Sequence, residues 1–268
     1  IWNAFICLGF IEGFLLRPIT AKKTPQAFVE ATKKNVAKDF VGNFAMTLIE
    51  DGAVSKQYFY SVDQPVDDQT IFPVASISKW VTSFGIMKMV EQGLVDLDQP
   101  VDNYLTRWHL PPSEFDNNKV TVRKLLSHSS GLVDELGYAG FTPDQKVQTI
   151  EESLTKAADT PHAEGVAKLG YEPGSRYQYS GAAYTILQLL IEEVTGLPFQ
   201  EYMTQEVFEP LGMTRSSVVL DANPELELTQ IYKNDGSTRP FNRFTALAAA
   251  SLFTCTTDLS KFLLANVS

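Results

Sequence analysis

The chain has few of the residues from which metal sites and disulfide frameworks are built. Its 268 residues include two cysteines, Cys7 and Cys255, and three histidines. No Cys-x-x-Cys pair occurs and the histidines are not at metal-ligand spacing, so the sequence contains no zinc or redox motif. We expect two free buried thiols, no metal ion and no cofactor.

Basic charge is also scarce. Lysine and arginine number 22 against 32 aspartates and glutamates, which gives a formal net charge of -10. Nucleic-acid binding needs clustered basic side chains against the phosphates, and no such patch is present, so we exclude nucleic acid as a partner. Glycine motifs for dinucleotides or phosphates and the Gly-x-Ser-x-Gly turn of some hydrolases are missing too.

Long hydrophobic runs are absent, with one borderline segment. Residues 1–16 are mostly apolar but are interrupted by Glu12, and Arg17 and Lys22 follow. A membrane-spanning helix needs ~20 apolar residues, and this segment is shorter. Residues 1–20 could be the remnant of a signal anchor, with a membrane tether through 1–16, or an ordinary helix packed on the domain. The basic residues that follow directly favour the anchor.

The two ends of the chain carry strand patterns. Residues 44–52 read as a strand that ends in an Asp-Gly turn, and residues 54–60 as its hairpin partner. Strand-like patterns return at 217–220 and 229–233. We therefore expect residues 21–75 and 214–268 to form a sheet-containing α/β part.

Residues 76–213 are dominated by helical patterns. The clearest is 76–92, where apolar residues recur at helical spacing up to Gly93. Further helices are expected after an Asp98 cap, at 121–127, 144–158 and 182–195, from Pro198, and at 259–265 after an Asp258 cap. The predicted fold class is α+β, an antiparallel sheet flanked by helices plus a mostly helical subdomain.

Two Ser-x-x-Lys pairs could carry nucleophilic chemistry. A serine at the start of a helix lies in the positive end of its dipole, and a desolvated lysine at i+3 can accept the serine proton. Ser76 opens an apolar helix, so Lys79 should be partly buried. Ser153 lies in a polar helix, so Lys156 should be solvated, and we interpret that second pair as a chance match.

A tyrosine pair, Tyr177 and Tyr179, follows the turn at 172–174. A phenol beside a nucleophile can relay a proton to a leaving group. Spacing alone favours a packed aromatic over this role, and it does not distinguish the two tyrosines because they share strand parity.

Five segments in this order resemble the β-lactamase-related serine hydrolases, which include class C β-lactamases, D-Ala-D-Ala carboxypeptidases and esterases. The segments are 74–79 (VASISK), 93–101 (GLVDLDQPV), 125–132 (LLSHSSGL), 172–180 (EPGSRYQYS) and 210–213 (PLGM). The resemblance runs from about Phe44 to the end of the chain and implies a β-lactamase/transpeptidase-like fold.

The resemblance also implies roles for individual residues. Ser76 matches the acylated serine, Lys79 the lysine that activates it, and Tyr179 the tyrosine of the Tyr-x-Asn box. The backbone N–H of Ser76 would supply half of the oxyanion hole. Gly181 stands where the family has a substrate-contacting asparagine, which makes efficient β-lactam hydrolysis less expected. His128 matches a structural position that bonds backbone near the site.

The family's third box should follow the helix at 259–265, and the sequence ends at Ser268 before it. We therefore expect the C-terminal strands to be missing from this chain and its own activity to be poor.

Together these features predict a serine hydrolase that acts through a Ser76 acyl-enzyme on an ester, amide or β-lactam. Esterase or D-amino-acid peptidase activity is expected ahead of β-lactamase activity. The alternative is a catalytically silent binding or scaffold protein with the same fold. The predicted partner is a small-molecule or peptide-like substrate, and the predicted location is periplasmic or extracellular, with oligomeric state left open.

Overall fold

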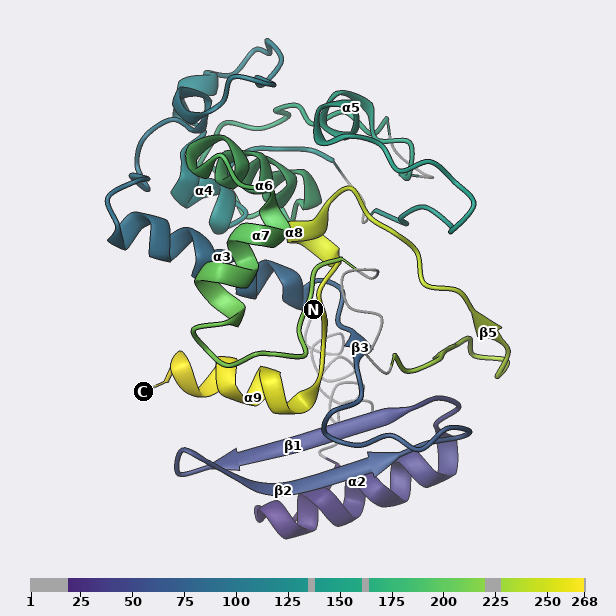
Figure 1. Cartoon of the computed structure of the whole chain (residues 1–268). Helices are drawn as coiled ribbons and strands as arrows, with labels where there is room; N and C mark the ends of the chain where they lie inside the picture. Colours follow the sequence, from purple (N-terminus) through teal and green to yellow (C-terminus); the bar gives the residue numbers. More distant parts are fainter. Residues whose placement is uncertain (1–18, 135–137, 161–163, 220–227, 268) are drawn as a thin grey trace, which may run out of the picture. The chain divides into compact units, whose positions relative to one another are not determined.

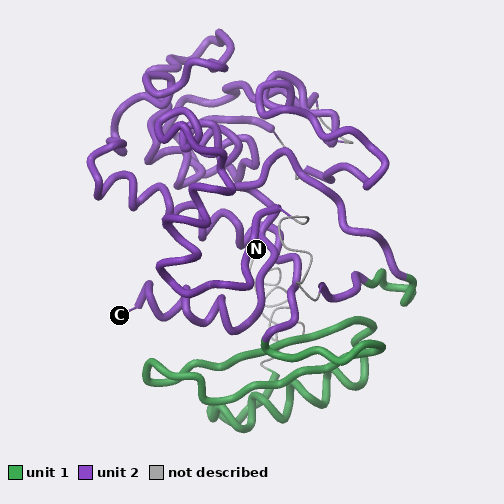
Figure 2. The backbone as a smooth tube through the Cα atoms, viewed as in Figure 1, with its two compact units in different colours: residues 1–68, 232–237 green, residues 69–231, 238–268 purple. Residues whose placement is uncertain are grey.

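The computed structural model describes residues 19–134, 138–160, 164–219 and 228–267 (Figure 1). The chain groups into two compact units (Figure 2): residues 1–68 with 232–237, and residues 69–231 with 238–268. The division predicted from sequence stays a prediction, and the anchor predicted at 1–16 lies outside the described residues. None of the described helices combines the length and apolar character that a membrane span requires.

Residues 19–68 of the first unit contain a β-hairpin and one helix. β1 (Phe44–Glu50) and β2 (Ala53–Tyr60) pair antiparallel, which confirms the predicted hairpin. Its turn has φ of 50° at Asp51 and 75° at Gly52, the left-handed pair that suits an Asp-Gly hairpin turn. α2 (Pro25–Asp39) packs on β2. We predicted no helix there, because its buried residues are few and widely spaced.

The predicted helix at 76–92 is confirmed as α3 (Ile77–Glu91). Ser76 is its N-cap residue, and Gly93 follows the C-cap with a φ of 72°. A left-handed glycine at this place ends a helix without strain from a Cβ atom. The helix therefore starts at the serine that the sequence singled out.

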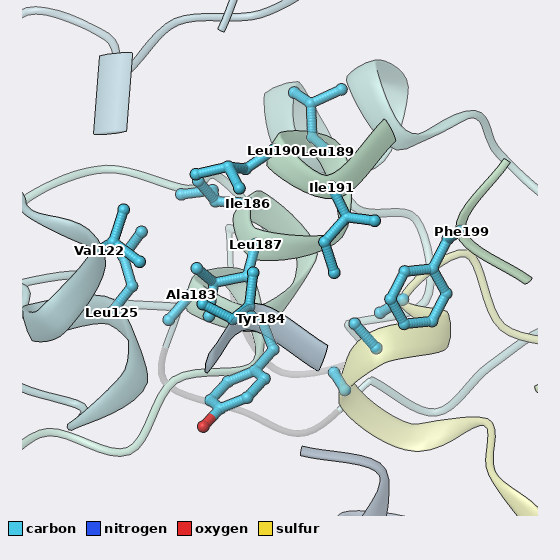
Figure 3. Close-up of a cluster of buried hydrophobic side chains, with 14 of the residues drawn as sticks. Val122, Leu125, Ala183, Tyr184, Ile186, Leu187, Leu189, Leu190, Ile191 and Phe199 are labelled. Carbon is cyan, nitrogen blue, oxygen red and sulfur yellow. The ribbon is translucent and has the colours of Figure 1, made fainter. Parts of the chain in front are cut away.

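α6 (Gly181–Thr195) is the core helix of the second unit and confirms the predicted helix at 182–195. Every residue from Gly181 to Ile191 is buried. It contacts α3 and four shorter helices: α4 (Val122–Leu126), α5 (Ile150–Lys156), α7 (Phe199–Met203) and α8 (Leu247–Ala250). Figure 3 shows its aliphatic side chains in this cluster, together with Tyr184, whose hydroxyl points away from them.

Two helices in the middle of the chain differ from prediction in where they begin. Asp98 does not cap a helix: its carboxylate accepts two hydrogen bonds of 2.8 Å from Arg123, and the 3-10 helix η1 (Val101–Tyr104) begins after Pro100. α5 begins at Ile150 because Thr149 forms a capping box with Glu152, so the predicted helix at 144–158 is shorter than expected.

Three other segments complete this region. The predicted helix at 121–127 is confirmed as α4, with Thr121 as its N-cap. η2 (Asn117–Lys119) is a further 3-10 turn. The helix predicted from Pro198 is confirmed as α7, and it continues as the π-helix η3 (Thr204–Phe208).

The strands of the described residues form three separate two-stranded sheets. β3 (Phe72–Pro73) pairs with β6 (Phe253–Thr254), and Ser217 makes a single bridge to Phe253. β4 (Ile231–Tyr232) and β5 (Thr238–Arg239) flank a turn at 233–236. The mixture of helices and antiparallel sheets is the predicted α+β class.

The last helix, α9 (Thr256–Ala265), begins earlier than predicted, with Cys255 as its N-cap. The prediction that Asp258 caps it is wrong. Asp258 lies in the first turn, and its carboxylate accepts hydrogen bonds from the Arg215 N–H (2.8 Å) and the Ser216 hydroxyl (3.0 Å). Cys255 is a free buried thiol, as predicted, whereas Cys7 lies outside the described residues.

Candidate functional site

Ser76 lies at the exposed start of α3, directly after a strained residue. Ala75 has a φ of 45°, a left-handed conformation that non-glycine residues rarely adopt. The turn is held by Ser78, whose hydroxyl donates to the Ala75 carbonyl and accepts the Leu252 N–H at 2.8 Å. Within the described part of the chain, the Ser76 N–H has no protein acceptor. The geometry thus presents both the hydroxyl and the N–H of Ser76 to a ligand.

Lys79 is buried one helical turn further on, with 7% of its surface exposed. Its Nζ lies 3.2 Å from Ser76 Oγ and donates a 2.7 Å hydrogen bond to the carbonyl of Ala249 in α8. Among the described residues, no carboxylate forms an ion pair with it. The amine is therefore held against the serine by a neutral acceptor from another part of the chain.

Two tyrosine rings also lie close to this amine. Lys79 Nζ lies 4.9 Å from the ring centre of Tyr179 and 5.7 Å from that of Tyr184. Tyr184 is fixed in place: its hydroxyl lies 2.9 Å from Ser83 Oγ and donates to the Leu126 carbonyl at 3.2 Å. Burial raises the pKa of the Tyr184 phenol. Among the described residues the Tyr179 hydroxyl has no hydrogen-bond partner, so of the two phenols beside Lys79 it is the unbonded one.

Sequence reasoning missed Tyr184, Ser83 and the Ala249 carbonyl. The hydrophobic period of α6 places Tyr184 among core residues, and nothing in its spacing marks the hydroxyl as part of a site. The Ala249 contact joins residues 170 positions apart in the sequence. Such contacts depend on tertiary packing, which a pattern of local spacing does not contain.

The second Ser-x-x-Lys pair has the opposite burial. Ser153 is buried, with 3% of its surface exposed, whereas Lys156 is exposed at the end of α5. At the first pair the serine is exposed and the lysine is buried. A buried serine beside a solvated lysine offers no accessible nucleophile and no desolvated base.

Gly181 lies at the start of α6, against side chains from a distant segment. Its N–H and that of Ala182 donate to Asp134 Oδ2 at 2.8 and 2.7 Å, and its carbonyl accepts a bond from Thr185. A Cβ atom added at Gly181 would lie 2.7 Å from Tyr138 Cδ2. The aromatic ring of Tyr138 thus fills the space that a side chain at 181 would need. The role of Gly181 in substrate binding stays a prediction.

His128 connects the tyrosines to the backbone that carries them. Its Nδ1 accepts the Ser180 N–H at 3.2 Å, and its ring centre lies 4.5 Å from that of Tyr179 and 5.3 Å from that of Tyr184. Burial and the positive charge of Lys79 lower the pKa of His128 to about 4. The imidazole is therefore neutral over the neutral pH range, with its proton on Nε2.

The described residues bring together an exposed hydroxyl, a buried amine and a partly exposed phenol in the second unit. They contain no group of three or more His, Cys, Asp or Glu side chains that could share a metal ion. An arrangement of this kind can attack a carbonyl carbon and move the proton that the attack releases.

Comparison with known proteins identifies a family and several relatives. The family model described as Beta-lactamase matches residues 32–268. The chain is 31% identical to Penicillin-binding protein 4* of Bacillus subtilis over 58% of its own length and 32% of that protein's. It is 30% identical to Esterase EstB of Burkholderia gladioli over 60% of its own length and 42% of that protein's.

A solved structure agrees with these relatives. The octameric penicillin-binding protein homologue from Pyrococcus abyssi is 29% identical, with a TM-score of 0.72 over 90% of this chain and 56% of that one. The chain spans less than half the length of the two curated relatives. The family match covers most of the chain, including α3 and α6, and on this evidence the chain belongs to the beta-lactamase family.

Proposed function

We propose that this chain carries the nucleophilic centre of a serine hydrolase in which Ser76 forms the acyl-enzyme and Lys79 takes the serine proton. The observation that carries the proposal is the 3.2 Å distance between Lys79 Nζ and Ser76 Oγ, with the hydroxyl exposed and the amine buried. A nucleophile and base within hydrogen-bond reach are the requirement for activating a serine.

The reaction would begin with attack of Ser76 Oγ on the carbonyl carbon of the substrate, as the hydroxyl proton passes to the neutral form of the Lys79 amine. The Ser76 N–H, at the positive end of α3, donates to the oxyanion that forms. As the tetrahedral intermediate collapses, a proton passes to the leaving group, which departs as an alcohol or amine. Water then releases the acid from Ser76.

Tyr179 is proposed as the group that relays the proton between Lys79 and the leaving group. Its ring faces the Lys79 amine at 4.9 Å, and 45% of its surface is exposed. Tyr177 is 67% exposed. The ring contact with His128 at 4.5 Å holds Tyr179 beside the lysine. These contacts favour Tyr179 over Tyr177 for the role.

The proposed substrates are esters or D-amino-acid peptides ahead of β-lactams. Gly181 has no side-chain amide that could contact a β-lactam, and the Tyr138 ring occupies the space beside it. Both features support this order of substrates. The relative named Esterase EstB makes an ester the first substrate to test.

The test is hydrolysis of p-nitrophenyl acetate by the full-length protein and two variants. Ser76→Ala should reduce turnover to the rate of the uncatalysed reaction, whereas Ser153→Ala, the matched change at the other Ser-x-x-Lys pair, should leave it within about twofold. Loss of activity in the Ser153 variant alone would contradict the proposal. An inactive wild-type protein would favour the alternative of a silent binding or scaffold protein.

We also propose a location outside the cytoplasm, periplasmic or extracellular, with a membrane tether through residues 1–16. The apolar character of that segment and the basic residues after it support the proposal. Fractionation of cells that express the full-length protein tests it, and recovery of the protein from the soluble cytoplasm would contradict it.

A further inference from the structure

His128 adopts a backbone conformation that its residue type disfavours. α4 ends in a Schellman motif, in which the Ser129 N–H donates to Lys124 and the His128 N–H to Leu125, at 2.9 and 3.2 Å. His128 occupies the left-handed position of this motif with a φ of 55°. Glycine is the usual residue there because it has no Cβ atom. A strained histidine at this position therefore calls for a role that its side chain performs.

The side chain and backbone of His128 bracket Tyr179. The His128 carbonyl accepts the Gln178 N–H at 2.7 Å, and His128 Nδ1 accepts the Ser180 N–H at 3.2 Å. Between these two bonds, the imidazole lies over the Tyr179 ring, with 4.5 Å between centres and 35° between planes. One residue thus fixes the backbone on both sides of Tyr179 and also its ring.

The proposed base is a second neighbour of that ring. Lys79 Nζ lies 4.9 Å from the centre of the Tyr179 ring. Among the described residues, the aromatic contacts of Tyr179 are with His128 alone. Removing the imidazole would leave a partly exposed tyrosine free to rotate away from the lysine.

We propose that His128 is a positioning residue, whose neutral imidazole holds Tyr179 in the orientation that faces Lys79 and thereby supports proton transfer during acylation. The inference rests on the proposed serine hydrolase function. An Nδ1 atom that accepts a hydrogen bond must carry a lone pair, so the role requires the neutral ring protonated on Nε2. The lowered pKa of His128, about 4, is consistent with that form.

The change His128→Gly separates this role from a purely structural one. Glycine is the preferred residue at the left-handed position, and this gain offsets the loss of the hydrogen bond from the Ser180 N–H, so the melting temperature should change little. If His128 positions Tyr179, kcat for p-nitrophenyl acetate should nevertheless fall by ~10- to 100-fold, within the range that one proton-transfer group contributes. KM should change less than about threefold, since the imidazole does not touch the substrate.

Two further variants make the result decisive. His109→Ala removes an exposed imidazole whose ion-pair contact is with Asp102, outside the site residues, and should leave kcat unchanged. His128→Asn keeps a residue that tolerates the left-handed conformation and a side-chain acceptor for Ser180, but lacks the ring, and should lose activity like the glycine variant. This variant serves if His128→Gly fails to fold.

A double-mutant comparison tests whether His128 acts through Tyr179. The variant carrying both His128→Gly and Tyr179→Phe should be no slower than Tyr179→Phe alone, because the imidazole then has nothing to position. Losses that multiply, or full kcat in both His128 variants, would overturn the inference. The proposed function fails separately, if wild-type protein shows no turnover that depends on Ser76.

Discussion

Lys79 is the residue on which the proposed chemistry depends most. It is buried, lies against Ser76 and is oriented by a backbone carbonyl of α8. A lysine can lose its proton and act as a base, whereas a guanidinium stays protonated in proteins. The two side chains carry the same charge in their protonated forms, so exchanging them tests the base and not the charge.

Lys79→Arg should reduce kcat/KM for p-nitrophenyl acetate by ~10³-fold, the scale on which a general base contributes. Lys156→Arg, the matched change in the second pair, should have no effect because that side chain is solvated. Steady-state kinetics on both variants provide the measurement. Near-normal turnover of the Lys79 variant would remove this residue from the mechanism.

Tyr179→Phe and Tyr177→Phe remove one hydroxyl each from neighbouring tyrosines. We expect the first change to reduce kcat by ~10²-fold and the second by less than about threefold, since the Tyr179 ring is the one beside Lys79. The measurement is kcat for the same ester. A larger loss in the Tyr177 variant would reverse the assignment.

The neutral imidazole of His128 also makes stability depend on pH. In the unfolded chain the pKa of His128 is near 6.5, and in the folded chain it is about 4. Its contribution is complete above pH 6.5 and is lost as pH falls toward 4, because the unfolded state binds the proton first. The groups that face the ring are Lys79 and the tyrosines at 177, 179 and 184.

The free energy of unfolding should therefore fall more between pH 7 and pH 4.5 for wild-type protein than for His128→Gly. Urea unfolding at the two pH values measures this difference. Equal losses in both proteins would show that His128 does not contribute to the pH dependence.

At the residue scale, spacing within one helix could predict that Ser76 and Lys79 meet, because i and i+3 lie on one face. It could not predict that Tyr184 or the Ala249 carbonyl joins them, because those contacts cross between elements. The lysines of the two Ser-x-x-Lys pairs differ in burial as expected: Lys79 is buried and Lys156 is exposed. The apolar neighbours of Lys79 in the sequence were the basis of that expectation.

At the scale of elements, the sequence predicted the turns and helix ends that neighbouring residues form by themselves. The Asp-Gly hairpin and the glycine-ended helices α3 and α6 are examples. α8 was not predicted: Ala246 provides no side-chain cap, and the helix is held by the distant residues Thr82 and Gln188, which bond Ala248 at 3.1 Å each. Asp98 and Asp258 failed as predicted caps because distant partners engage their carboxylates.

The start of α6 gives a prediction that runs against helix propensity. Alanine is favoured over glycine in a helix by ~1 kcal/mol, so propensity alone expects Gly181→Ala to stabilise. The structure predicts a loss of about 1–3 kcal/mol instead, because the added Cβ would press on the Tyr138 ring. Urea unfolding measures the change.

The double variant with Tyr138→Ala separates the two explanations. Relative to Tyr138→Ala alone, Gly181→Ala should then cease to destabilise, because the space beside residue 181 is open. A stabilising Gly181→Ala in the wild-type background would show that the ring yields without strain.

At the scale of the whole molecule, the strand and helix patterns predicted the α+β class, and the five ordered segments predicted the family. The grouping of residues was not predictable in the same way. Residues 232–237 belong with residues 1–68 although more than 160 positions separate them. The spacing of apolar residues indicates which face of a helix or strand is buried, but it does not indicate which distant element covers that face.

The central claim concerns one atom, Ser76 Oγ, and covalent labelling tests it most directly. The full-length protein would be treated with a fluorophosphonate, which reacts with activated serines, and digested for peptide mass analysis. We predict added mass on the peptide that contains Ser76, and none on it after the change Lys79→Arg. Label on Ser153, or no label on the wild-type protein, would contradict the account.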